Sequence, residues 1–147
     1  MAFTNSNDIL QGRTNTVFPS GSEVVVQPAS IALLAGDLTL NNIGAVGVLP
    51  AGCVPVAMYV DSAELDSGTN TITLDIGLLN AAGTAFDTTF ATGLTVAQAG
   101  GVVQVLSANL LRLAKASGDR KIGVKVSAAP NVAQAGSVFI HTHYRAA

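Results

Sequence analysis

Residues 38–60 read LTLNNIGAVGVLPAGCVPVAMYV, and this uncharged stretch decides between a membrane helix and a pair of β-strands. A helix that crosses a bilayer needs about 20 apolar residues that satisfy their own backbone hydrogen bonds. Here two prolines and three glycines interrupt the run, and β-branched residues crowd it. The stretch therefore predicts two strands joined by a turn at Pro50, Ala51 and Gly52, and it predicts no membrane partner.

The rest of the chain carries further strand signals. Residues 71–80 alternate cleanly, with Ile72, Leu74, Ile76 and Leu78 on one face and polar side chains on the other. Other strand-like runs lie at 23–27, 30–41, 54–65, 122–127 and 137–145. About eight short strands separated by regular turns predict an all-β fold, a single β-sandwich.

Two segments depart from this alternation. Residues 1–22 are polar and show no sustained period, so we expect a flexible N-terminal arm followed by a β-sandwich domain over residues 23–147. Residues 102–116 mix a valine run with leucines at helical spacing, which predicts a strand followed by a short helical or extended piece.

The composition limits the classes of function. The chain has 147 residues, a length usual for one domain. Its mean hydropathy is +0.49 and 11% of its residues are charged, which predicts self-association or docking on a large partner. The net charge of −2 and the lack of a dense basic stripe argue against nucleic-acid binding.

The single cysteine and the first residues bear on the cellular compartment. Cys53 stands alone, so no intramolecular disulfide is possible, and we expect a buried thiol that packs as a small apolar group. The first residues lack the basic and apolar regions of a secretory signal. Folding in a reducing cytoplasm is the expectation.

His141 and His143 are the only histidines of the chain. Two residues apart on a strand, they point to one face together with Phe139 and Arg145. A zinc site needs further ligands from another strand, and Arg145 would oppose a cation. We therefore interpret these residues as a solvated or interface face.

Asp61, Glu64 and Asp66 lie close together before a glycine-containing turn. Carboxylates can bind calcium, but the spacing is not that of an EF-hand loop, and an extended segment would point Asp61 away from the other two. We interpret the cluster as a charged edge and turn that resists edge-to-edge pairing. Hydrolase, zinc-protease and phosphate-loop motifs are missing from the sequence, so we predict no enzyme, no catalytic, cofactor-binding or metal-binding residue, and no cofactor.

Three framework segments resemble small structural proteins of tailed bacteriophages. They are LPAGCVPV at 49–56 with VDSAELDSG at 60–68, TITLDIGLLN at 71–80, and DRKIGVKV at 119–126 with the closing strand that ends at Tyr144 and Arg145. The kin closest in type are capsid decoration, or cement, proteins. Those proteins are jelly-roll-like sandwiches on the outside of the phage head, often as trimers.

The resemblance implies a jelly-roll-like sandwich that binds the outside of a capsid and stabilises contacts of the major capsid protein. It also implies a homo-oligomer, most often a trimer, made in the host cytoplasm and located on the virion surface. One alternative is another virion component, such as a neck, tail or fibre-associated sandwich. A second is a carbohydrate-binding module, which the lack of tryptophan and the presence of only two tyrosines disfavour.

Overall fold

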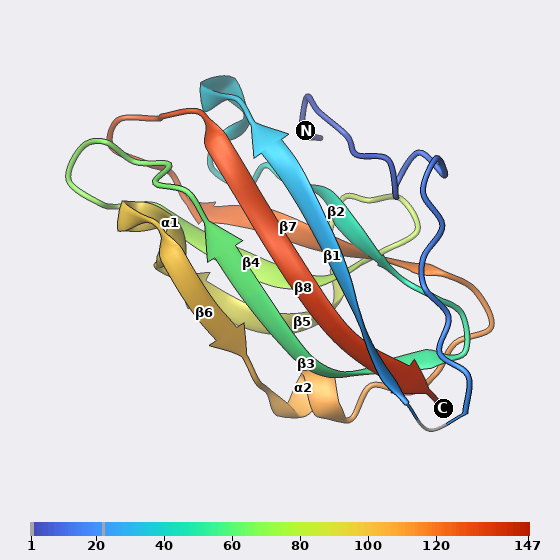
Figure 1. The fold of residues 1–147 in the computed structure, drawn as a ribbon. Helices are drawn as coiled ribbons and strands as arrows, with labels where there is room; N and C mark the ends of the chain where they lie inside the picture. The colour runs from blue at the N-terminus through green and yellow to red at the C-terminus, as the bar shows by residue number, and fades with distance from the viewer. Residues whose placement is uncertain (1, 22) are drawn as a thin grey trace.

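Over residues 2–21 and 23–147, the part that the computed structural model describes, eight strands form two four-stranded sheets that pack face to face (Figure 1). The strands are β1 (Val24–Leu33), β2 (Ile43–Leu49), β3 (Cys53–Ser62), β4 (Thr73–Leu79), β5 (Phe86–Leu94), β6 (Gly101–Val105), β7 (Arg120–Ala128) and β8 (Gly136–Ala146). The predicted β-sandwich is confirmed.

The strand order is that of a jelly roll. One sheet has the order β1-β8-β3-β6 and the other β2-β7-β4-β5, with antiparallel neighbours throughout. The first strand therefore pairs with the last, and the second strand pairs with the seventh. This nesting leaves β1 and β2 as edge strands on one side of the sandwich and β6 and β5 as edge strands on the other.

The core lies between the two sheets and follows the predicted alternation. Ile72, Leu74 and Ile76 are fully buried, as the pattern of residues 71–80 predicted. The predicted turn between β2 and β3 is also present, and Gly52 takes a positive φ of 74° there, a conformation that favours glycine.

Residues 102–116 follow the prediction of a strand and then a helical piece. They contain most of β6 and the short helix α2 (Ala108–Leu111), whose first turn is capped because Ser107 Oγ accepts a hydrogen bond from Leu110 N at 3.2 Å. The other helices are η1 (Ala35–Asp37) and α1 (Val96–Ala99). Within the described residues no helix is long and apolar enough to cross a bilayer.

The strand assignments needed correction in two places. The runs at 23–27 and 30–41 were expected as separate strands, but β1 continues through Pro28. Along a strand, the backbone N–H and C=O groups of every second residue point to the same side. The Ser30 carbonyl points away from β8, toward Asn7, and Pro28 has the same orientation. The N–H that proline lacks would therefore lie at the free edge of the sheet, where no hydrogen bond between strands is lost. Strand β5 was missed because its pairing with β4 shifts register three times, which breaks any simple alternation.

The N-terminal segment, residues 2–21, lies along the side of the sandwich formed by β1 and β2 (Figure 1). Asn7 Nδ2 donates to Ser30 O of β1 at 2.9 Å and to Val46 O of β2 at 2.6 Å, so one side chain bridges the two sheets. Asn5 Nδ2 donates to Ala32 O at 2.7 Å. The two asparagines cap carbonyls of the β1 edge that would otherwise face water or another strand.

Apolar contacts also join this segment to the core. Phe3 is 9% exposed, and its ring fills the space beside Gly44 where a Cβ would otherwise stand. The buried Tyr144 hydroxyl donates to Val17 O, and burial raises the pKa of Tyr144 to about 12, so the hydroxyl remains a donor. Met1 and Ser22, the ends of the expected arm, lie outside the described residues. The flexible arm expected from the sequence and the attachment that these contacts describe lead to opposite results when the segment is deleted, a test that is discussed below.

Gly77 on β4 marks a close contact between neighbouring strands. A Cβ at this position would collide with the backbone O of Thr88 and stand 2.8 Å from Cγ of Phe86. We expect Gly77→Ala to lower the free energy of unfolding by about 1–3 kcal/mol, because the strands must separate. Gly36→Ala is the matched control, since nothing lies within 4 Å of its added Cβ. Urea unfolding, monitored by circular dichroism, measures the free energy of unfolding of both variants. Equal losses in the two variants would contradict the close contact between β4 and β5 at Gly77.

Candidate interaction surface

The outward side chains of the β1-β8-β3-β6 sheet form one continuous face, which we call the apolar sheet face. Residues paired directly across antiparallel strands point to the same side, so the strand register defines its members. They are Val24, Val26, Pro28, Ser30 and Ala32 of β1, Ser137, Phe139, His141, His143 and Arg145 of β8, Val54, Ala57, Tyr59 and Asp61 of β3, and Val102 and Gln104 of β6.

Large apolar side chains on this face remain open to solvent. Val24 is 52% exposed, Val26 45%, Phe139 41% and Val102 66%. Among the described residues, none of the large exposed apolar side chains lies on the strands of the other sheet. The two sides of the sandwich therefore differ in kind, and the apolar side is the candidate for a partner.

Charge distribution follows the same division. The four strands of the apolar sheet face carry two charged residues, Asp61 and Arg145, whereas the strands of the other sheet carry five. Those five are Asp75, Asp87, Arg120, Lys121 and Lys125. Asp61 pairs across from Phe139 and Arg145 pairs across from Val24, so the two charges lie at opposite ends of the face.

The structure brings the two histidines to this face, as expected. His141 and His143 alternate with the buried Ile140, Thr142 and Tyr144 along β8. The His143 ring packs against Tyr59, with ring centroids 5.4 Å apart. Within the described residues, no group of three or more His, Cys, Asp or Glu side chains is arranged to hold a metal ion. That the protein binds no metal ion remains a prediction.

The acidic cluster separates into three environments. Asp61 lies on the apolar sheet face, Glu64 is exposed, and Asp66 is fully buried, so Asp66 does not belong to the charged edge and turn that the sequence predicted. The Asp66 carboxylate accepts six hydrogen bonds from backbone N–H groups and one hydroxyl; the donors are Gly68 N, Thr71 N, Thr71 Oγ1, Ile72 N, Asn131 N and Val132 N. Its oxygens are therefore committed to the fold.

The hydrogen bonds to Asp66 also set its charge state. Burial alone would raise the pKa of this carboxyl, but the N–H groups of Val132, Asn131, Thr71 and Gly68 hold it well below its usual range. The group is therefore an anion at neutral pH, and it joins the β3–β4 loop to the β7–β8 loop. Sequence reasoning missed this role because two of the donors lie about 65 residues further along the chain, at Asn131 and Val132.

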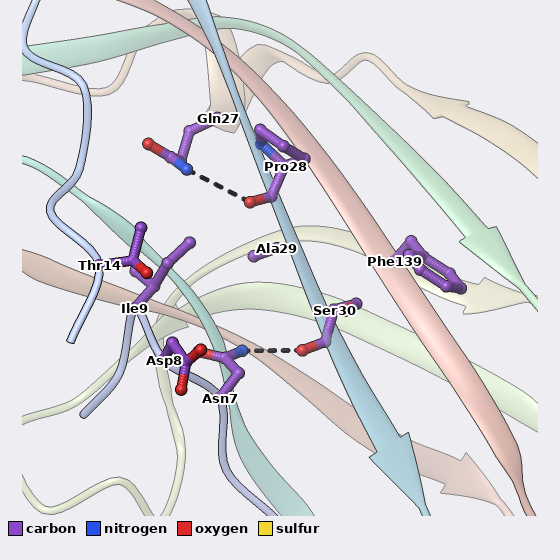
Figure 2. A pocket seen from close by; sticks show the side chains of 9 residues that line it. All are labelled: Asn7, Asp8, Ile9, Thr14, Gln27, Pro28, Ala29, Ser30 and Phe139. Atoms are coloured by element: carbon purple, nitrogen blue, oxygen red, sulfur yellow. Dashed lines mark hydrogen bonds between the residues drawn. The ribbon is translucent and has the colours of Figure 1, made fainter. Parts of the chain in front are cut away.

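A groove of about 460 Å³ opens between the N-terminal segment and β1 (Figure 2). Ile9 and Thr14 lie on the side of the N-terminal segment, and Phe139 of β8 lies on the far side of β1. Gln27 Oε1 accepts from Val17 N at 2.9 Å, and Asn7 already donates to the β1 backbone. The groove is therefore mixed in character: Asp8 and Thr14 add polar groups, whereas Ile9 and Phe139 add apolar surface, and Phe139 joins the groove to the apolar sheet face.

Cys53 is fully buried, as predicted. Burial raises the pKa of the Cys53 thiol, the nearby Asp119 adds to this effect, and Arg120 partly offsets it. A buried thiol with a raised pKa is a poor nucleophile, so Cys53 acts here as a packing residue.

Solved structures of phage capsids contain chains with this fold. A chain in the capsid of Ralstonia phage GP4 matches with a TM-score of 0.82 and 33% sequence identity, over 95% of this chain and 96% of that one. This chain belongs to the family of that phage capsid protein. No protein-family model matches the chain, and no curated protein is a significant relative of it.

Two more capsid structures place this phage capsid protein among similar folds. A chain in the capsid of cyanophage Pam1 matches with a TM-score of 0.66 and 25% identity, over 98% of both chains. A chain in the capsid of Helicobacter pylori bacteriophage KHP30 shares the fold, with a TM-score of 0.54 and 14% identity over 84% of this chain and 93% of that one. The protein is thus a structural component of a phage virion, which confirms the predicted class.

Proposed function

We propose that this phage capsid protein is a decoration, or cement, protein that binds the outside of the assembled head and stabilises contacts between major capsid subunits. The match to the GP4 capsid chain is the main support. It covers nearly equal shares of the two chains, so that capsid holds a chain of nearly the same length as a separate component. A compact sandwich of this kind fits a protein added to a shell.

The two-sided surface supports the same role. A protein that lies on a shell needs one side against protein and one side against water. The apolar sheet face has four large exposed apolar side chains and two charges, whereas the strands of the other sheet have five charges and no large exposed apolar side chain among the described residues. We further propose that the protein has no catalytic activity and works without a cofactor.

Stabilisation would follow from mass action. A ligand that binds the assembled, expanded shell and not its separated subunits stabilises the shell by its binding free energy. Copies that self-associate, with a trimer as the proposed form, bind a repeating lattice at several points at once and gain effective concentration. The proposed site of action is the capsid surface, after synthesis in the host cytoplasm.

Addition of the purified protein to expanded heads that lack it should give co-sedimentation and a higher temperature of DNA release. The release temperature should rise with protein concentration and level off when the sites are filled, because the binding free energy adds to shell stability. A fluorescent DNA dye measures release, and an unrelated β-sandwich of similar size is the control. Heads that sediment without the protein at saturating concentration would contradict a decoration role.

A further inference from the structure

We propose that the apolar sheet face is the surface that docks on the capsid shell, a proposal that rests on the decoration role above. The occupant is a broad, weakly charged protein surface of the assembled shell, with a basic group near Asp61 and an acidic group near Arg145. Phe139 is the proposed main anchor, because it is the largest exposed apolar side chain on the face; it lies on β8 in the same row as Ser30 of β1 and Asp61 of β3.

The face has the features of an incomplete interior. Four of its apolar side chains, Val24, Val26, Val102 and Phe139, are between 41% and 66% exposed, and covering them releases about 25 cal/mol for each Å² of apolar surface. On the opposite sheet, the chain itself covers an outward-facing apolar side chain. Leu79 points outward there yet is 8% exposed, and it packs where a Cβ on Gly123 would stand. The chain thus buries its own apolar side chains on one side and leaves them for a partner on the other.

The size of the face favours a shell over a second copy. Four strands about 4.8 Å apart and nine residues about 3.3 Å apart along β1, from Val24 to Ala32, cover roughly 19 by 30 Å, or about 570 Å² on each partner. Two copies paired through this face alone would bury about 1,100 Å² in total, still below the roughly 1,200–2,000 Å² of stable complexes. A shell avoids this limit, because linked copies dock at several lattice points together.

The two charges would fix the orientation of docking. Asp61 and Arg145 lie at opposite ends of the face, so reversing the protein on the shell would bring each charge against the wrong partner. Neither charged side chain forms a salt bridge within the described residues. Both are therefore available to a partner, and they supply specificity at little cost to the apolar centre.

Paired serine substitutions test the docking surface. The face variant carries Val26→Ser and Phe139→Ser. The control variant carries Leu111→Ser and Val132→Ser, which remove two side chains of similar exposure, 55% and 50%, away from this sheet. We expect the face variant to bind expanded heads at least about 10-fold more weakly than wild type, and the control to stay within about 2-fold. Melting temperatures and light scattering accompany both variants.

Each outcome separates the two proposals. If wild-type protein does not bind heads, the decoration role itself is wrong. If wild type binds and the face variant binds equally well, docking by this face is wrong. A face variant that loses oligomeric mass would show that the face joins copies of this chain, which also overturns the proposal. If the face variant does not fold, Val102→Ser on the edge strand β6 and Arg145→Glu apply the same test with less change to the core.

Discussion

Replacement of Asp66 by alanine is expected to lower the melting temperature by about 10 °C or more, because five backbone N–H groups lose their acceptor. These donors come from two loops: Gly68, Thr71 and Ile72 lie between β3 and β4, and Asn131 and Val132 lie between β7 and β8. Since β3 and β8 belong to one sheet and β4 and β7 to the other, a single carboxylate holds loops of both sheets together.

A matched substitution separates this effect from the loss of one negative charge. Asp87→Ala removes an exposed carboxylate from β5 and should leave the melting temperature almost unchanged. Asp66→Asn should fall between the two, because the amide keeps one oxygen acceptor but loses the charge. Differential scanning calorimetry gives all three values. Similar melting temperatures for Asp66→Ala and Asp87→Ala would show that the Asp66 hydrogen bonds do not stabilise the fold.

The same carboxylate predicts how stability depends on pH. Its pKa in the folded protein is lower than the value of about 4 expected for an unfolded aspartate. The stabilisation is therefore present above pH 4 and is lost as the pH falls from there toward the folded pKa. Asp37 adds to this with the same sign: burial would raise its pKa, but hydrogen bonds from Thr4 and Leu34 lower it. Asp66→Asn should lose less stability on acidification than wild type.

Deletion of residues 2–21 is the second large effect, with an expected fall in melting temperature of about 10 °C or more. The deletion removes buried Phe3, the acceptor of the Tyr144 hydroxyl, and the Asn7 bridge between β1 and β2. It would also leave Tyr144, at present fully buried, beside water. A freely flexible arm would instead leave the melting temperature unchanged on deletion, and that result would contradict the contacts described above.

Two phenylalanines of the same segment provide point variants. Phe3→Ala should cost about 3 kcal/mol in free energy of unfolding, since it empties a site in the core cluster. Phe18→Ala should cost less than about 0.5 kcal/mol, because that ring is 61% exposed. Urea unfolding measures the free energy of unfolding of both variants. A larger loss for Phe18→Ala than for Phe3→Ala would contradict the attachment of the segment through Phe3.

The fold could be predicted where one face of a strand is buried and its pairing is regular. Residues 71–80 show this best, since their period of two survives in β4 almost unchanged. Strand β5 shows the limit, because bulges shift its side chains between faces. The attachment of residues 2–21 depends on Phe3, which is buried although most of the segment is polar, and on Asn5 and Asn7, whose spacing matches the edge carbonyls of β1. Only the position of β1 gives those residues their partners.

The candidate interaction surface could be predicted in part. Alternation along β8 grouped Phe139, His141, His143 and Arg145 from the sequence alone. The valines of β1 and β6 join them only through the order β1-β8-β3-β6, which brings together strands far apart in the chain. The role of Asp66 was beyond prediction for the same reason, since its donors come from two loops that are about 60 residues apart in the chain, β3–β4 and β7–β8.

Electron cryo-microscopy of the virion tests the proposed decoration role most directly. The account predicts repeated density of this sandwich on the outer surface of the head lattice, with the sheet β1-β8-β3-β6 against the shell and the sheet β2-β7-β4-β5 toward solvent. A virion in which the protein occurs only at the neck or tail, with the outer surface of the head lattice bare, would contradict it.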